Sequence, residues 1–298
     1  MKKFVLCLIT VFLAAPALAR GDSAWVLPRN SWYVESRGGY GVSVNDRQEA
    51  YLFDSHIEVG FLEKATLLLD IPAVTLRTPA TETVEDGADI LVNNGFTDLF
   101  VGSRIALIEE PFALSLNGGF KIPTAYDVSF FPSLGEGQLD VELGLSAGYD
   151  FYPLEAYVQG GLGYRLRSPF DESHVLVSAA RREGRTLTKP ADEVLFHLDG
   201  GAWLTERLFA GLNLWGELAI PAAEALAQEQ VYVNPVLAYR LNPALDLSLQ
   251  ADVPLFNRNR QALTSVMLGI HLRFGDTLGR SVGLRGSVPD FARYDERL

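Results

Sequence analysis

Cysteine is almost absent from this chain: its 298 residues contain one, Cys7. Cys7 lies in the apolar run 4–13, which follows two lysines and precedes a small-x-small pattern at 17–19. This order is typical of a secretory signal peptide. We therefore predict a signal peptide at residues 1–19 and a mature chain, 20–298, that contains no thiol. Such a chain can form no disulfide, no cysteine-ligated zinc site and no cysteine nucleophile.

Long apolar runs are also missing. After the signal segment no stretch reaches about 18 apolar residues, so no helical membrane span is predicted. The alternative interpretation of the N-terminus, an uncleaved membrane anchor, is disfavoured because a spanning helix needs roughly 20 apolar residues.

Basic residues are fewer than acidic ones. The chain has 25 Lys and Arg against 37 Asp and Glu, and its formal net charge is −12. Nucleic-acid binding needs clustered basic side chains that contact phosphates. We therefore expect no nucleic-acid partner.

Alternation with a period of two is the dominant pattern that is present. From residue 138 to residue 151, even positions are polar or small and odd positions are apolar, without exception. Successive side chains of a strand point to opposite faces. Strands usually have about 5–6 residues, whereas a tilted strand that crosses a bilayer needs about 9–11. The segment therefore predicts a membrane-spanning strand.

The pattern recurs along the chain, and short and long connections alternate between its occurrences. The predicted strands are 31–44, 51–61, 65–76, 97–108, 112–124, 138–151, 154–167, 193–204, 208–218, 231–241, 245–255 and 262–274. Bacterial outer-membrane barrels have an even strand number, short periplasmic turns and long outer loops, which a soluble β-sandwich has no reason to show. We predict an all-β fold, a closed antiparallel up-and-down transmembrane barrel of about 12 strands at 20–274, with a periplasmic tail at 275–298.

Aromatic residues gather near the predicted periplasmic strand ends. They are Trp32, Phe61, Phe112, Phe151, Tyr239 and Phe274. Aromatic girdles of this kind mark a membrane interface. We predict the bacterial outer membrane as the location, with outer-membrane lipid, lipopolysaccharide and the barrel-assembly machinery as partners. The two longest loops, 77–96 and 168–192, are candidates for folding inward as a constriction.

Charged side chains gather on the face assigned to the lumen. The candidate lumen-lining, substrate-binding residues are Arg37, Asp54, His56, Glu58, Asp98, Arg104, Lys121, Asp140, Glu142, Arg165, Asp199, Glu217, Arg240 and Asp252. They could set selectivity in a water-filled pore, or pair with one another and fill a narrow barrel. We favour mutual pairing that leaves a narrow path.

Enzymatic motifs are not evident. His56, His197 and His271 share the lumen face and His174 lies in a loop, but there is no G-x-S-x-G motif and no paired-histidine spacing. We expect no catalytic residues, no metal site, no cofactor and no enzyme activity. A lipid-acting outer-membrane enzyme is the weaker alternative.

Three glycine-rich stretches resemble the outer-membrane protein family associated with the meta-pathway of phenol degradation. They are GFTD with GSR at 95–104, GFKIPT at 119–124 and LGEGQLDVELG at 134–144. The resemblance covers about residues 50–165. It implies an outer-membrane barrel that moves small, aromatic or hydrophobic compounds. The chain departs from such barrels in continuing beyond Phe274, where a terminal aromatic would be expected.

The function predicted is a channel or transporter for passive uptake or efflux of a small-molecule substrate. Diffusion down a gradient needs no cofactor. The main alternative is a non-conducting structural or docking barrel whose tail at 275–298 binds a periplasmic partner.

Overall fold

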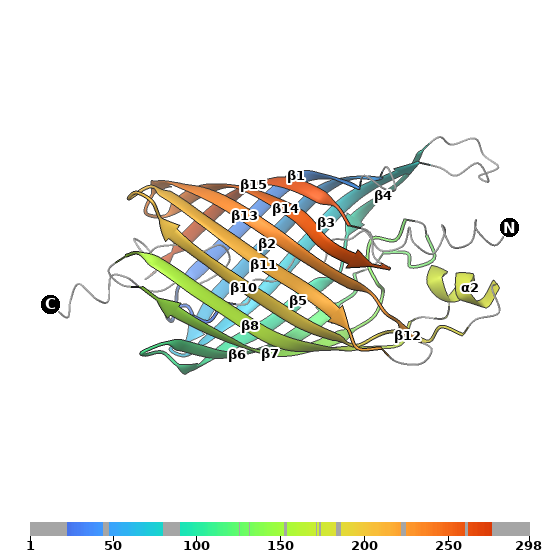
Figure 1. Cartoon of the computed structure of the whole chain (residues 1–298), viewed down its shortest axis with the longest axis horizontal. Helices are drawn as coiled ribbons and strands as arrows, with labels where there is room; N and C mark the ends of the chain where they lie inside the picture. The colour runs from blue at the N-terminus through green and yellow to red at the C-terminus, as the bar shows by residue number, and fades with distance from the viewer. Residues whose placement is uncertain are drawn as a thin grey trace.

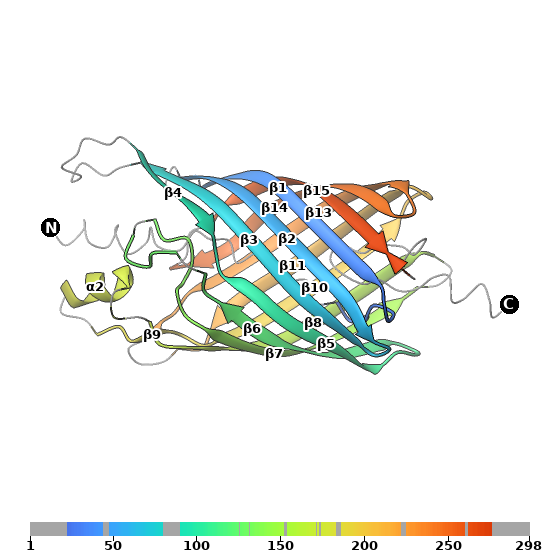
Figure 2. The same cartoon turned by 180° about the vertical axis from the view of Figure 1, so that it is seen from behind.

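The computed structural model shows a single closed β-barrel (Figures 1 and 2). It describes residues 23–43, 48–79, 90–124, 126–130, 132–151, 154–170, 172, 174–182, 186–221, 225–259 and 262–275. The predicted signal peptide and the predicted tail beyond Gly275 lie outside the described residues.

Consecutive strands pair antiparallel around the wall. The strands are β1 Trp32–Ser43, β2 Gln48–Leu62, β3 Ala65–Pro79, β4 Ile90–Phe96, β5 Leu99–Ile108, β6 Ala113–Ile122, β7 Asp140–Asp150, β8 Ala156–Arg167, β10 Glu193–Trp203, β11 Leu208–Ala219, β13 Glu229–Asn242, β14 Leu245–Arg258 and β15 Thr264–Phe274. The first strand closes the circle by pairing with the last, from Trp32 opposite Phe274 to Val42 opposite Thr264. The predicted 12-strand up-and-down barrel is confirmed, with β4 and β5 together forming one strand of the wall.

The prediction of a loop at 77–96 is wrong over much of its length. Strand β3 continues to Pro79, and β4 pairs with its outer half. Thr97 and Asp98 then interrupt the strand, and β5 pairs with the inner half of β3. Residues 90–96 (ILVNNGF) carry similar side chains on both faces, so they show little alternation. Only the pairing with β3 makes this segment a strand.

The two faces of the wall have opposite polarity. Outward-facing Leu143, Leu162 and Leu268 are 60%, 69% and 68% exposed, whereas inward-facing Glu35 and Asp140 are completely buried. An apolar outer surface is favourable only against hydrocarbon. A closed barrel can span it because every backbone hydrogen bond of the wall is made between strands. The fold therefore places the protein in the bacterial outer membrane.

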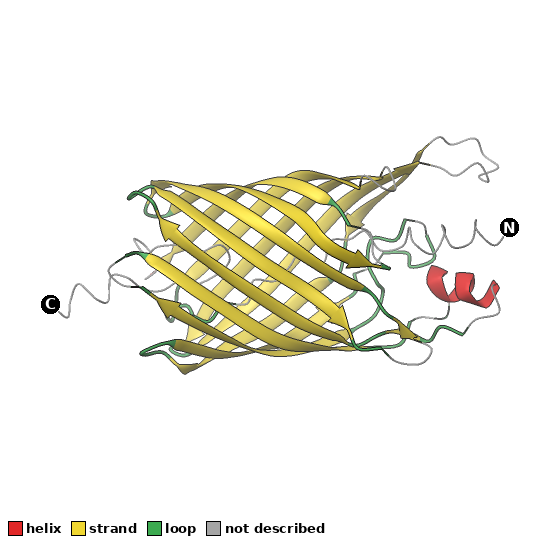
Figure 3. Ribbon diagram, in the orientation of Figure 1, coloured by secondary structure: helices red, strands yellow, loops and turns green. Residues whose placement is uncertain are grey.

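The two ends of the barrel differ, as Figure 3 shows. One end has short turns. The other carries long connections, which include helix α2, Val175–Arg182, and a short parallel pair of β9, Lys189–Pro190, with β12, Ala225–Leu226. The short-turn end is periplasmic by the rule for such barrels. All six girdle aromatics are 40–50% exposed on the outer surface. Within the described part of the chain, no helix is long and apolar enough to cross a membrane.

Candidate functional site: the barrel lumen

All fourteen candidate lumen residues lie on the inner face. Glu58, Arg104 and Asp140 are completely buried, and the most exposed side chain, that of Arg240, is only 19% exposed. The period of two thus located them correctly on the inside. Contact between any of them and a substrate stays a prediction. Their contacts divide most of them into three groups.

The first group, the extracellular network, spans β5 to β11. The Lys121 ammonium lies 3.4 Å from Asp98 and 3.2 Å from Asp140, and it also binds Glu136. Arg167 binds two of these three acids, Asp140 at 3.0 Å and Glu136. Sequence reasoning missed Glu136 because it lies in the connection between β6 and β7, where no strand parity assigns it a face.

Arg165 extends this network along the wall. Its guanidinium lies 2.8 Å from Glu142, 2.5 Å from Glu193 and 2.9 Å from Glu217. Glu193 also binds Arg167 at 2.7 Å. The extracellular network therefore surrounds three cationic side chains with six carboxylates, which leaves an excess of negative charge.

The second group, the central network, lies on β1, β2 and β5. Arg37 contacts Glu35 at 3.1 Å and Asp54, and donates to the Gln250 amide oxygen at 3.1 Å. Both partners of each ion pair are buried. Removing one partner of a buried pair typically costs about 3–5 kcal/mol, because the other charge stays buried without it.

Arg104 and His56 complete the central network. Arg104 contacts Glu58 at 3.2 Å, and Glu58 lies 3.0 Å from His56 Nε2. His56 Nδ1 binds Asp70. Both ring nitrogens of His56 are therefore engaged, which does not suit a general base with a free lone pair.

The third group lies at the periplasmic end. Asp246 is 2.8 Å from Arg273 and 3.6 Å from Arg240, whose guanidinium carbon lies 3.9 Å above the centre of the Trp203 ring. A cation over an indole face is a favourable arrangement.

Two candidate residues lie between these groups. Asp252 accepts hydrogen bonds from Asn234 at 2.8 Å and from Ser265 at 2.9 Å. Asp199 is 3% exposed on β10, directly across from Asn213 of β11. Asp252 also interacts electrostatically with Arg37 of the central network.

A segment that the sequence analysis did not single out crosses the lumen near its periplasmic end. Residues 23–30 precede β1, and most of them lie inside the barrel: Ser23, Ala24 and Leu27 are 0%, 1% and 4% exposed, whereas Arg29 and Asn30 are exposed. We call these residues the N-terminal segment. Asn30 donates its backbone N–H to Gly60 O at 2.7 Å, which fixes the segment at the β1–β2 side.

The far end of the N-terminal segment reaches the opposite wall. Ala24 N donates to Gln159 Oε1 at 2.8 Å, and Ser115 Oγ donates to Ser23 O at 3.2 Å. Trp25 packs edge-on against Tyr157, with ring centres 5.9 Å apart. The apolar stretch Trp25-Val26-Leu27 was the sequence signal that could have predicted this placement. A solvent-exposed periplasmic linker has no need of three consecutive apolar side chains.

The middle of the N-terminal segment is bonded as well. Leu27 N donates to Thr66 Oγ1 at 2.7 Å, and Trp25 O accepts a hydrogen bond of 3.0 Å from Arg104. The segment therefore spans the lumen from β1 to β8, held mainly by backbone groups.

The extracellular mouth is narrowed by the described residues of the connection 123–139 between β6 and β7. The predicted inward folding of 77–96 stays a prediction, because residues 80–89 lie outside the described part of the chain. Tyr126 donates to Asp98 and accepts from Gly137 N at 2.7 Å. Burial and the Asp98 carboxylate raise the pKa of Tyr126 well above its ordinary value, so its hydroxyl stays protonated. Leu134, 3% exposed, packs into an apolar patch on the inner wall. That patch consists of Ala50, Leu52, Val74, Leu76, Leu263 and Met267.

The connection 168–192 lies above this loop. Phe170 packs against the His174 ring, with ring centres 4.5 Å apart and planes tilted by 35°, and it also packs with Leu176 of α2. His174 approaches Gly137 of the inward loop. This connection therefore caps the extracellular loop cluster.

His271 has no free ring nitrogen for catalysis or metal binding. His271 is engaged on both ring nitrogens, at 2.7 Å by the Tyr33 hydroxyl and at 2.7 Å by Ser248. Among the described residues, no group of three or more His, Cys, Asp or Glu side chains is arranged to hold a metal ion.

No family model matches the chain, and no curated protein matches it. Solved structures do. The COG4313 outer membrane channel from Pseudomonas putida F1 matches with a TM-score of 0.62 and 14% identity, over 86% of this chain and 100% of that one. The KdgM porin in complex with disordered oligogalacturonate matches with a TM-score of 0.47 and 9% identity, over 82% and 99% of the two chains.

The first of these similarities establishes the class of fold. This chain shares the β-barrel architecture of that outer-membrane protein along the whole length of that structure. At 14% identity it does not carry over a substrate. The resemblance to the phenol-degradation family stays a prediction.

Proposed function

We propose that the protein is a passive outer-membrane channel for small molecules that prefers cations to anions. The observation that carries the proposal is the charge of the inner face. Eleven buried carboxylates face the lumen or its mouth: Glu35, Asp54, Glu58, Glu136, Asp140, Glu142, Glu193, Asp199, Glu217, Asp246 and Asp252. Among the described residues, six Lys and Arg side chains are buried: Arg37, Arg104, Lys121, Arg165, Arg167 and Arg273.

Such an excess of one sign makes the lumen attractive to the other sign. A low-dielectric wall focuses the field of the fixed charges into the water between them. A membrane-spanning wall with polar side chains inside and an apolar outside also fits a conduit better than a soluble binding protein.

The lumen is narrowed at both ends in this structure. The N-terminal segment crosses the periplasmic mouth and the connection 123–139 crosses the extracellular one. We therefore expect small unitary conductance with transient closures, as these elements move in and out of the path.

The test is single-channel recording of refolded residues 20–298 in a planar bilayer with a KCl gradient. We expect discrete current steps and a reversal potential shifted toward the equilibrium potential of K⁺. Heat-modifiable migration in gel electrophoresis shows that the barrel has folded. A folded barrel that carries no current would overturn the channel proposal. A reversal potential shifted toward the equilibrium potential of Cl⁻ would overturn the cation preference.

A further inference from the structure

A row of polar side chains crosses the inner wall from β8 to β15. Each member lies directly across from the next in the strand register or is hydrogen-bonded to it, and each is between 2% and 7% exposed. The members are Gln159, Asp199, Asn213, Asn234, Asp252 and Ser265. We call them the polar row. It contains two carboxylates, four neutral groups and no Lys or Arg, so its own charge is negative.

Two rings beside the polar row lie against glycine backbone. A Cβ on Gly161 would lie 2.4 Å from His197 Cε1. A Cβ on Gly201 would lie 2.2 Å from Phe209 Cζ. A larger residue at either position would push the ring further into the lumen. The two glycines therefore keep both rings against the wall on the two sides of Asp199.

Three buried polar atoms at or beside the polar row have no hydrogen-bond partner within the described part of the chain. Asn213 Oδ1 lies on the row itself, directly across from Asp199. His197 Nε2 and Trp215 Nε1 lie one inward position nearer the extracellular side. The three side chains are between 2% and 8% exposed. Buried polar groups are nearly always hydrogen-bonded, so these atoms indicate a partner that the described chain does not supply.

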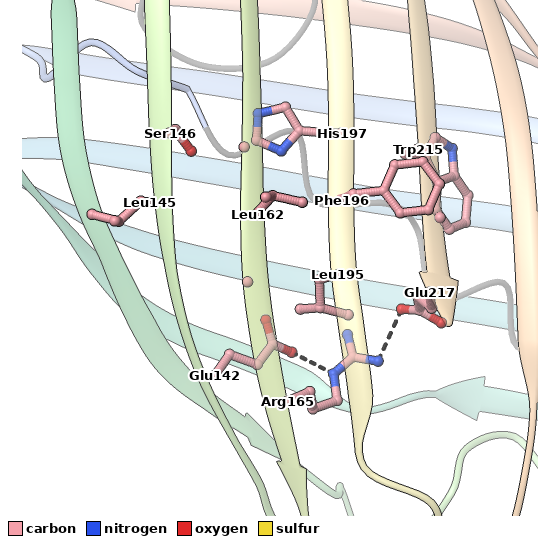
Figure 4. Close-up of a pocket in the computed structure, with 13 residues that line it drawn as sticks. Glu142, Leu145, Ser146, Leu162, Arg165, Leu195, Phe196, His197, Trp215 and Glu217 are labelled. Atoms are coloured by element: carbon pink, nitrogen blue, oxygen red, sulfur yellow. Dashed lines mark hydrogen bonds and ion pairs between the residues drawn. The ribbon is translucent and has the colours of Figure 1, made fainter. Parts of the chain in front are cut away.

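The space beside His197 and Trp215 suits water. Figure 4 shows the cavity that these two residues line together with Arg165 and Glu217. It leaves about 40 Å³ for water-sized molecules, and a neighbouring cavity leaves about 10 Å³. One buried water needs roughly 10–15 Å³ on this measure, so the larger cavity has room for about three water molecules. Water there would connect the polar row to the extracellular network.

The N-terminal segment covers the periplasmic side of the polar row. Ala24 N donates to Gln159 Oε1 at 2.8 Å. Trp25 packs edge-on against Tyr157, which is the next inward residue of β8 toward the periplasm. Displacement of this segment would therefore uncover Gln159 and the adjacent Asp199.

The opposite wall is different, because the cations of the central network occupy it. Arg37 and Arg104 are 2% and 0% exposed, and each is held by carboxylates. A cation that passed along that wall would approach two guanidinium groups, which repel it. The polar row instead presents carboxylate, amide and hydroxyl oxygens, which can replace part of the hydration shell of a cation.

We propose that small hydrated cations cross the middle of the barrel along the polar row, and that Asp199 is the residue that determines their preference over anions. A cation there contacts the Asp199 carboxylate and Asn213 Oδ1, while water beside His197 and Trp215 completes its hydration. This inference rests on the proposed channel function and deepens it by naming the path and the residue that sets selectivity.

The first test measures the permeability ratio of K⁺ to Cl⁻ for refolded residues 20–298 in planar bilayers. Asp199→Asn, which is nearly isosteric, should lower the ratio about three-fold or more. Asp127→Asn makes the same chemical change at an exposed position and should leave the ratio unchanged. Heat-modifiable migration shows that each variant has folded. An unchanged ratio in folded Asp199→Asn, or equal changes in the two variants, would overturn the inference.

The second test measures access to the polar row in detergent micelles, without current. Asn213→Cys is compared with Asn117→Cys, whose parent side chain is equally buried but is held by Arg104 and Ser146. Residues 20–298 contain no other cysteine. Mass spectrometry follows modification by 2-aminoethyl methanethiosulfonate, which is cationic, and by 2-sulfonatoethyl methanethiosulfonate, which is anionic. The cationic reagent should modify Asn213→Cys about ten-fold faster than the anionic one does, and faster than it modifies Asn117→Cys.

The outcomes separate the path from the channel. Equal rates for the two reagents at Asn213→Cys, no modification there, or faster modification of Asn117→Cys would overturn the path. A conducting parent whose selectivity does not depend on Asp199 overturns this inference alone. A folded parent that carries no current overturns the channel proposal, and the modification rates then decide whether cations enter along the polar row.

Discussion

At the extracellular mouth the inward loop is anchored by ion pairs. At the periplasmic mouth the N-terminal segment is anchored mainly by hydrogen bonds between neutral groups, together with one from Arg104 to Trp25 O. Glu136 of the loop binds both Lys121 and Arg167. By contrast, Ala24 N and Leu27 N of the segment donate to an amide and a hydroxyl of the wall. Buried ion pairs are costly to separate, whereas each neutral hydrogen bond contributes only about 0.5–1.5 kcal/mol.

The covalent connections of the two elements differ in the same sense. The loop is joined to β6 and β7 at both of its ends, so it can shift but not leave. Among the described residues, the N-terminal segment is covalently joined to the barrel at one end, through Ser31 and β1. We infer that the periplasmic closure is the one that opens more readily.

The largest effect is expected from removing the N-terminal segment. Deleting residues 20–29 should raise the unitary conductance several-fold and abolish brief closures, because nothing in the wall ladder depends on these residues. Single-channel recording measures this, and heat-modifiable migration checks the fold. Unchanged conductance in a folded deletion variant would show that the segment does not limit the current.

A covalent lock sharpens the same comparison. Leu27 N lies 2.7 Å from Thr66 Oγ1, so Leu27→Cys with Thr66→Cys should form a disulfide in a protein expressed as residues 20–298, which contains no other cysteine. Oxidation should hold the channel at its lowest conductance, and dithiothreitol should restore the parent level. Each single-cysteine variant is the control and should not respond to either reagent. A locked channel that still opens fully would contradict gating by the segment.

A smaller effect is expected at the extracellular mouth. Glu136→Gln removes one carboxylate shared by Lys121 and Arg167, which loosens the loop and reduces the excess of negative charge at this mouth. Current fluctuations in the open state should increase, and the permeability ratio of K⁺ to Cl⁻ should fall about two-fold. Asp127→Asn, an exposed position in the same connection, is the matched control and should change neither quantity.

The smallest effect is expected from neutralising one wall carboxylate that belongs to neither of the two elements crossing the mouths. Glu217→Gln keeps the shape of the side chain near Arg165 but removes one negative charge from the lumen. The K⁺ preference should decrease by less than about two-fold with unchanged conductance. Glu206→Gln, exposed in a periplasmic turn, should leave the reversal potential unchanged. Equal shifts for both variants would show that the lumen charge does not set selectivity.

The sequence predicted the wall well because alternation is a local property. Each residue of a segment such as 138–151 points to one face or the other whatever the rest of the chain does. The inward placement of Arg104, Lys121 and Arg165 followed from parity alone. Strand β4 was missed for the same reason, since its two faces carry similar side chains and only pairing with β3 reveals it.

Contacts between distant residues could not be predicted in this way. Parity places Lys121 and Arg167 inside, but not beside a common carboxylate from a connecting loop. The direction of residues 23–30 into the barrel, instead of away from it, likewise depends on Thr66, Ser115 and Gln159 at three separate places in the wall.

The sequence by itself therefore determined the barrel, its strand directions, the polarity of its two faces and the excess of acid inside. Those properties depend on the local period of two and on composition. Only the tertiary structure decided which charges meet, which segments cross the mouths and where His197 and Trp215 are left without partners. Closing the sheet brings residues far apart in the chain within a few ångströms, and no local pattern records which of them will meet.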